Sequence, residues 1–156
     1  MIKRKYEMFL NASKKKFQKI YGVLLTFSPA AADTLSRYFN ESGTNPKDFD
    51  AIFTGDLGHI GSELLSELLQ EKGIELQNHF DCGKLIFDRE RQDVHAGGSG
   101  CGCCASVLCG YILPKMLDGE LGNILFCATG ALLSPTSTQQ GDSIPCIAHL
   151  VNIRKR

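Results

Sequence analysis

The residues with the most chemical potential in this 156-residue chain are crowded into one stretch, HAGGSGCGCCASVLCGY, at residues 95–111. Its first half is a glycine-rich loop, and its second half has the composition of a helix that begins near Cys103. Such a stretch could cradle a phosphate group, ligate a metal ion, carry a nucleophilic cysteine or form a tightly packed structural element. Each of these interpretations makes a different demand on the neighbouring residues.

A phosphate-binding loop is the first possibility, and the residues argue against its common forms. A Walker loop places Lys-Ser or Lys-Thr after its last glycine to hold phosphate and magnesium, whereas this loop continues with Cys-Gly-Cys-Cys. The dinucleotide-binding fingerprint GxGxxG follows none of the predicted strands. The amides at the start of the helix could still hold a small anion, and the carboxylates of a small acid would suit them.

The cysteines could instead form a metal site or supply a nucleophile. A zinc site usually has paired ligands of the CxxC type, whereas this stretch has CxCC followed by Cys109. Further ligands could come from His95, Cys82 and Asp81. A nucleophilic cysteine needs a base or a helix N-terminus beside it, and Cys103 or Cys104 would have the second of these.

A structural role for the cysteines has more support than either chemical role. Cysteine is among the most buried residue types and packs as a small hydrophobic side chain. Together with Ala105, Ser106 and Gly110, the cysteines give the helix a face of small side chains that would let another helix approach closely. We therefore expect a tight packing element with a glycine-lined mouth, reduced cysteines, no bound metal and no cofactor.

The composition is that of an ordinary globular domain. Apolar residues make up 43% of the chain and charged residues 22%, and 17 basic residues balance 17 acidic ones, so no overall charge favours nucleic acid as a partner. Seven cysteines without the spacing of a disulfide framework predict free thiols in a reducing, intracellular compartment. No stretch has the pattern of a signal peptide or a membrane span.

The elements that must position the glycine-cysteine stretch alternate between strands and helices. The first predicted helix starts at Ser28-Pro29, with Ser28 as N-cap, and ends at Gly43; the second ends at Gly73, and the third covers residues 103–117. Strands are predicted at residues 20–27, 49–56, 84–87, 123–129 and 147–153. This order predicts a three-layer α/β domain. The polar loop 131–146 between the last two strands has no room for a crossover helix, so we expect this pair to be antiparallel and the sheet to be mixed.

Several strings in the chain are similar to the carboxyl-terminal half of stage V sporulation protein AD (SpoVAD). They are TGDLG (54–58), DCG (81–83), DRERQDVHAGGSGCGCCASVLCGYILPKM (88–116) and ATGALLSPTSTQQGDSIPCIAHLV (128–151), and SPAAADTL (28–35) fits the same alignment. This family resembles the thiolase and ketoacyl-synthase superfamily, in which two similar halves pack their central helices around a pseudo-twofold axis. The resemblance implies that residues 28–156 form one thiolase-like half, preceded by a basic, divergent segment at 1–27, and that the chain is a fragment or split copy.

The resemblance also implies a role in spore formation. It points to binding of dipicolinic acid for uptake into the developing spore, together with membrane proteins of the same sporulation operon. The protein would then be peripheral, on the cytoplasmic side of the forespore or spore inner membrane. A missing amino-terminal half, or a second copy of this chain, would complete the fold.

The same resemblance bears on catalysis. Condensing enzymes of this fold carry a histidine just after a strand of this half and a histidine or asparagine in its glycine-rich loop, whereas Gly55 and Asp56 stand at the first position and Gly98 and Ser99 at the second. The chain therefore lacks the residues that stabilise the oxyanion and transfer protons during acyl transfer in those enzymes. We expect a binding protein whose ligand site is lined by Asp56, Gly98, Ser99 and Gly100. The alternative is a residual acyltransferase that uses Cys103 or Cys104.

Overall fold

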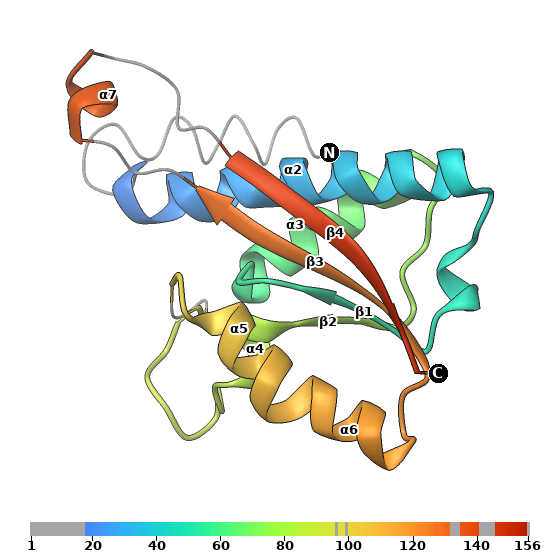
Figure 1. The fold of residues 1–156 in the computed structure, drawn as a ribbon. Helices are drawn as coiled ribbons and strands as arrows, with labels where there is room; N and C mark the ends of the chain where they lie inside the picture. The colour runs from blue at the N-terminus through green and yellow to red at the C-terminus, as the bar shows by residue number, and fades with distance from the viewer. Residues whose placement is uncertain (1–17, 96, 99, 132–134, 141–145, 156) are drawn as a thin grey trace.

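Four strands form one sheet that separates two layers of helices, as Figure 1 shows. The computed structural model describes residues 18–95, 97–98, 100–131, 135–140 and 146–155, so most of the predicted basic segment lies outside the described residues. The strands are β1 (Ala51–Thr54), β2 (His79–Asp81), β3 (Asn123–Ala131) and β4 (Cys146–Arg154), in the spatial order β2-β1-β3-β4. β1 runs parallel to β2 and β3, and β4 is antiparallel to β3. The predicted α/β class, mixed sheet and antiparallel last pair are confirmed.

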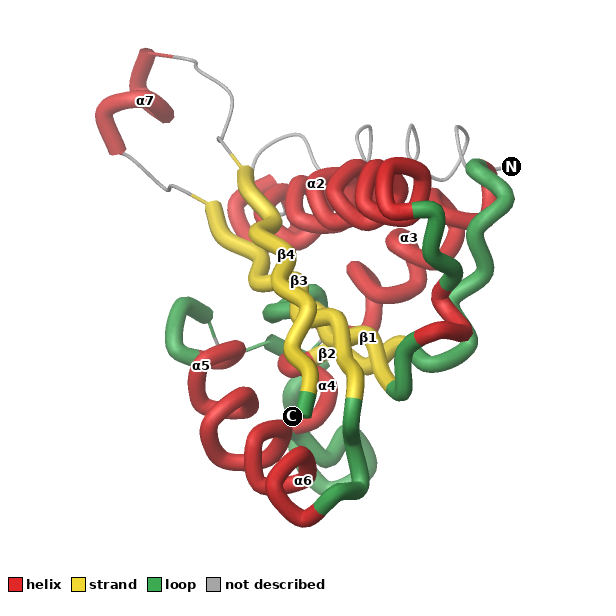
Figure 2. Tube along the Cα trace, turned by 45° about the vertical axis from the view of Figure 1, so that its right-hand side comes forward, coloured by secondary structure: helices red, strands yellow, loops and turns green. Residues whose placement is uncertain are grey.

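The helices lie on the two faces of this sheet (Figure 2). One face carries α2 (Gln18–Ser42) and α3 (Gly58–Glu71). The chain between these two helices forms a short 3-10 turn, η1 (Pro46–Asp48), and then strand β1. The other face carries α4 (Cys82–Leu85) and one continuous helical segment made of α5 (Cys103–Val107), the π-helical turn η2 (Leu108–Ile112) and α6 (Leu113–Asp118). This segment is the predicted helix 103–117. A last short helix, α7 (Pro135–Gln140), lies between β3 and β4, where the sequence predicted only a polar loop.

Side chains of the central strands point alternately to the two faces of the sheet, and each face has its own hydrophobic core. Ile52 and Leu125 point to the side of α2 and α3, where they pack with Leu35, Leu65 and other buried residues. Phe53 and Phe126 point to the opposite side and pack with Cys103, Val107, Ile112 and Met116 of the helical segment. Because β1 and β3 are buried on both faces, they read as continuous apolar runs in the sequence.

The predicted strand at 20–27 is wrong, because these residues belong to α2. An apolar run of that length fits a buried strand or a helix equally well, and here the helical pattern that follows extends back through it. Ser28 therefore does not cap a helix: its hydroxyl donates to the carbonyl of Gly61 at 2.8 Å and fastens α2 to α3. Pro29 lies inside α2 rather than at its first position. The predicted helix ends at Gly43 and Gly73 are confirmed, since both glycines have a positive φ angle just past their helices.

The predicted strand at residues 84–87 is also wrong. The strand lies earlier, at His79–Asp81, and the chain turns directly into α4 at Cys82. β1 is only four residues long, so its pairing with β2 stops where Thr54 faces Asp81. Beyond that point, the described residues contain no further strand beside residues 84–87 with which these residues could pair.

Candidate functional site

The carboxylate of Asp81 holds together the ends of β1 and β2 and the start of α3. Its side chain is 1% exposed and accepts hydrogen bonds from the Thr54 hydroxyl at 2.7 Å and from the backbone N–H groups of Leu57 and Gly58 at 2.9 and 2.8 Å. Burial raises the pKa of Asp81, whereas these three hydrogen bonds favour its ionised form. The arrangement fixes the TGDLG turn at the carboxyl end of β1.

His79 extends this buried network. Its Nε2 atom lies 2.9 Å from the Thr54 hydroxyl oxygen. That hydroxyl has one proton and donates it to Asp81, so the histidine must donate from Nε2, which defines the neutral tautomer. Burial lowers the pKa of His79 to about 4, and the charge of Lys84 acts in the same direction. The imidazole is therefore neutral near neutral pH.

Asp56 connects the TGDLG turn to the glycine-rich loop. Its carboxylate accepts a hydrogen bond from the Gly100 N–H at 2.6 Å, and its own N–H donates to the Thr129 hydroxyl at 3.2 Å. Gly98 is also in contact, because a Cβ atom on Gly98 would lie 3.1 Å from an Asp56 carboxylate oxygen. Three of the predicted site residues, Asp56, Gly98 and Gly100, are therefore neighbours, and Ser99 lies outside the described residues.

This close packing depends on two glycines, Gly83 and Gly55, because a side chain at either position would clash with its neighbours. A Cβ atom on Gly83 would lie 2.3 Å from Asp56 Oδ1 and 3.1 Å from Asp81 Oδ1, so the two carboxylate oxygens are no farther apart than the sum of these distances. A Cβ atom on Gly55 would lie 2.6 Å from the Thr129 hydroxyl oxygen and 2.7 Å from the Thr129 backbone nitrogen. Any larger residue at either position would push the turn away from the elements that hold it.

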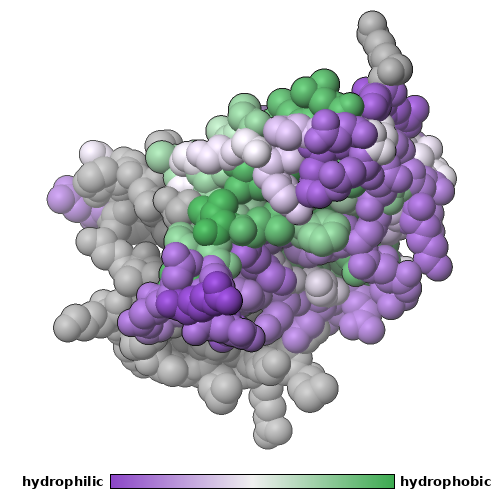
Figure 3. All heavy atoms as spheres, turned by 90° about the horizontal axis from the view of Figure 1, so that it is seen from below, coloured by the Kyte–Doolittle hydropathy of each residue, from purple (hydrophilic) through white to green (hydrophobic). Residues whose placement is uncertain are grey.

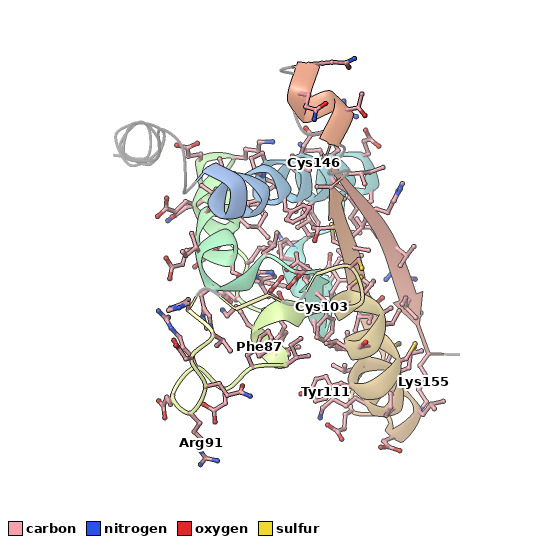
Figure 4. The ribbon with its side chains drawn as sticks, turned by 90° about the vertical axis from the view of Figure 1, so that its left-hand side faces the viewer. Phe87, Arg91, Cys103, Tyr111, Cys146 and Lys155 are labelled. Atoms are coloured by element: carbon pink, nitrogen blue, oxygen red, sulfur yellow. The ribbon has the colours of Figure 1, made fainter. Side chains whose placement is uncertain are left out.

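The cysteines divide between the core and the surface. Cys82 and Cys103 are buried under the sheet, and Figure 4 shows Cys103 directed into the interior. Cys104 is half-buried, whereas Cys101 and Cys109 are exposed, and all seven cysteines are free thiols. Burial raises the pKa of the Cys82 thiol well above its usual range. Within the described residues, no group of three or more His, Cys, Asp or Glu side chains is placed to hold a metal ion.

The sequence reasoning missed the buried part of this site. The sequence indicates Asp81 only as a possible further metal ligand, and it assigns no role to Thr54, His79 or Gly83. The available signal was positional: the TGD and DCG strings each follow a strand, and the carboxyl ends of parallel strands meet at one edge of a sheet. The misplaced strand at 84–87 hid that relation, because it put Asp81 before a strand rather than at the end of one.

Comparisons with known proteins point to one family. The family model described as stage V sporulation protein AD (SpoVAD) matches residues 22–154. The curated "Stage V sporulation protein AD" of Bacillus subtilis (strain 168) is 45% identical over 123 residues, which cover 78% of this chain and 36% of that protein. The chain thus spans about a third of the length of this curated relative. Among the described helices, none combines the length and apolar character that crossing a membrane requires.

Proposed function

The chain belongs to the stage V sporulation protein AD family, and on that premise we propose that it is a non-catalytic protein that binds dipicolinic acid for uptake into the developing spore. The observation that carries the non-catalytic part is that the Asp56 side chain is a hydrogen-bond acceptor in the structure. Condensing enzymes of the superfamily it resembles need a hydrogen-bond donor at this position to stabilise the oxyanion. The Asp56 carboxylate already accepts the Gly100 N–H, which gives it a role in holding the glycine-rich loop.

The rival function, a residual acyltransferase, would depend on Cys103 or Cys104. The burial of Cys103 counts against it as a nucleophile, since it is 2% exposed and packed among core residues. Cys104 is half-buried and remains the better candidate. Incubation of the chain with acyl-CoA, followed by mass spectrometry of the intact protein and its peptides, separates the two functions. An acyl group on Cys104 would establish the enzyme and end the non-catalytic proposal.

The proposal includes partners and a location. We infer that the protein acts with membrane proteins of its operon at the cytoplasmic face of the forespore or spore inner membrane. We also infer that these residues pair with an amino-terminal half of the same fold or with a second copy of this chain. The exposed small residues of the helical segment support this pairing, namely Ala105, Ser106, Cys109 and Gly110. Tyr111, Leu113 and Leu117 are exposed beside them, and Figure 3 shows hydrophobic residues gathered on this underside.

Binding is tested by titrating dipicolinate into the isotopically labelled chain and following the backbone amide resonances. Because the match covers only 36% of the curated relative's length, we expect weak binding by this chain alone, in the millimolar range rather than the micromolar range. The amides of Asp56, Gly98 and Gly100 should shift, and pyridine, which lacks both carboxylates, should leave them unchanged. Resonances that do not respond to dipicolinate at several tens of millimolar would overturn the proposal for this chain.

A further inference from the structure

Strand β4 forms a long and regular edge of the sheet. It covers nine residues, Cys146–Arg154, and it pairs with β3 on one side only. Its register with β3 is continuous over all nine residues, so no β-bulge interrupts the edge. Figure 4 shows β4 along one side of the molecule, and no described element lies beyond it in that view. Folded monomers usually protect such an edge with a proline, a bulge, charged residues or a covering segment. β4 contains no proline, and Arg154 at its end is its only charged residue.

The hydrogen-bond pattern shows which backbone groups of β4 point outward. The Lys155 N–H, just past the strand, donates to the Gly122 carbonyl at 2.7 Å. Because antiparallel partners exchange hydrogen bonds at every second residue, the odd-numbered residues of β4 bond to β3 and the even-numbered residues point away from it. A contact with α2 confirms this assignment, since the Thr34 hydroxyl donates to the outward carbonyl of Ala148 at 3.0 Å.

The outward backbone groups of β4 are largely available to another strand. Within the described residues, the backbone N–H and C=O groups of Leu150 and Asn152 have no hydrogen-bond partner. The Ala148 carbonyl oxygen can accept a second bond, because it has two lone pairs. Ile147 and Val151 point to the face of the sheet opposite Ala148 and are 50% and 51% exposed. The edge thus offers backbone partners at alternate residues and apolar side chains beside them, which is what an added β-strand requires.

We propose that β4 pairs antiparallel with β4 of a second copy of this chain, so that two four-stranded sheets join into one. Only even-numbered residues can exchange hydrogen bonds across this edge, and a twofold axis at Leu150 meets that condition for all nine residues. Ala148 then lies opposite Asn152 of the second copy. The charge of Arg154 favours the antiparallel direction: the arginine then faces Cys146 of the second copy, whereas a parallel pair would place two arginines side by side.

This contact is separate from the pairing through the helical segment and from the binding of dipicolinate, and it depends on neither. A single pair of strands makes a small interface, so we expect a dissociation constant of roughly 0.1–1 mM. A contact of this strength is sparsely occupied in dilute solution. It becomes occupied where copies are already held close together, because their effective concentration then reaches the millimolar range.

The test is amide hydrogen exchange, followed by NMR at protein concentrations from about 20 μM to about 1 mM. The isotopically labelled chain carries Ser106→Trp, which blocks pairing through the exposed small residues of the helical segment. Exchange of the Leu150 and Asn152 amides should slow by about two- to fivefold over this range, since exchange proceeds from the remaining monomer. The Val151 amide bonds to β3 and should be protected at every concentration.

A charged side chain on β4 should weaken the contact without disturbing the bonds to β3. In the same background, Val151→Lys places a charge at an exposed edge position and should raise the dissociation constant by about tenfold or more. The matched control Gln70→Lys adds the same charge at an exposed position on α3 and should leave the constant unchanged within about twofold. In a mixture of labelled and unlabelled copies, isotope-filtered spectra should show His149 of one copy beside Val151 of the other.

Three results would overturn the proposal. Protection of the Leu150 and Asn152 amides at every concentration would mean that the edge is already covered within one chain. Rapid exchange of both amides up to about 1 mM would mean that no second copy pairs there. A concentration dependence that Val151→Lys leaves unchanged would place the contact on another surface.

Discussion

The low pKa of His79 predicts a specific pH dependence of stability. The imidazole has a pKa of about 4 in the folded protein against an ordinary value of 6.5. Between these two values the unfolded chain binds a proton that the folded protein does not, so the free energy of unfolding falls as the pH falls from about 6.5 toward 4 and levels off below that. Linkage over this interval gives a loss of about 2 kcal/mol between pH 7 and pH 5 from His79 alone.

The perturbation that isolates this contribution is His79→Gln, because a glutamine amide can still donate to the Thr54 hydroxyl but does not titrate. Urea unfolding of the unmodified chain and of the variant is measured at pH 7 and pH 5, at one protein concentration. The loss on acidification should be about 2 kcal/mol smaller in the variant. Asp81 has a raised pKa and so contributes with the opposite sign, but it is present in both proteins and cancels in the comparison.

Two further measurements guard this result. His149→Gln removes an imidazole from an exposed position on β4 and controls for the substitution itself. The ring Cε1–H resonance of His79, followed against pH in the folded protein, reports its pKa directly. Titration of His79 near 6.5 would refute the reasoning, because it would mean that the ring is hydrated and does not depend on the buried network for its tautomer.

Three other predictions follow from the same packing. Gly55→Ala should lower the free energy of unfolding by about 1–3 kcal/mol, because its Cβ would clash with Thr129. The control Gly102→Ala, whose Cβ would meet nothing within 4 Å, should change this free energy by less than about 1 kcal/mol. Equal effects of the two substitutions would contradict the close packing at Gly55. Iodoacetamide should modify the exposed Cys101 and Cys109 in the folded protein, and it should reach the buried Cys82, Cys103 and Cys127 only after unfolding. Metal analysis of the purified protein should find no zinc. Alkylation of Cys103 at the rate of Cys109, or one zinc per chain, would count against the structural role of the cysteines. The chain should self-associate in sedimentation experiments. Ser106→Trp should block this assembly, whereas the control Gln70→Trp at an exposed position on α3 should not. A stable monomer at tens of micromolar would show that the small-residue face around Ser106 needs no partner.

The sequence predicted the fold well where local signals and burial agreed. β1 and β3 form continuous apolar runs in the sequence, and Gly43 and Gly73 follow the ends of α2 and α3, so the order of these elements could be recognised from the apolar runs and the glycines. The prediction failed at 20–27, where an apolar run was compatible with strand or helix, and at 84–87, where the true strand has only three residues. A strand that short is fixed by pairing with β1 rather than by its own composition.

The candidate site was predictable only in part for a related reason. Asp56 and the glycine-rich loop stand out by composition, and the resemblance connects them, although 44 residues separate Asp56 from Gly100. Asp81 and His79 do not stand out, because their importance comes from their places at the two ends of β2 and from their hydrogen bonds to Thr54 on the neighbouring strand β1. No spacing rule within the sequence relates these residues.

The buried network and the glycine-rich loop form one mechanical unit, which has a consequence for interpreting variants. His79 and Asp81 fix Thr54 and the amides of Leu57 and Gly58, and these fix the turn that carries Asp56. Asp56 in turn holds Gly100. A change at His79, Asp81 or Gly83 should therefore alter both stability and any ligand binding by the loop, and loss of binding in such a variant does not identify a ligand contact.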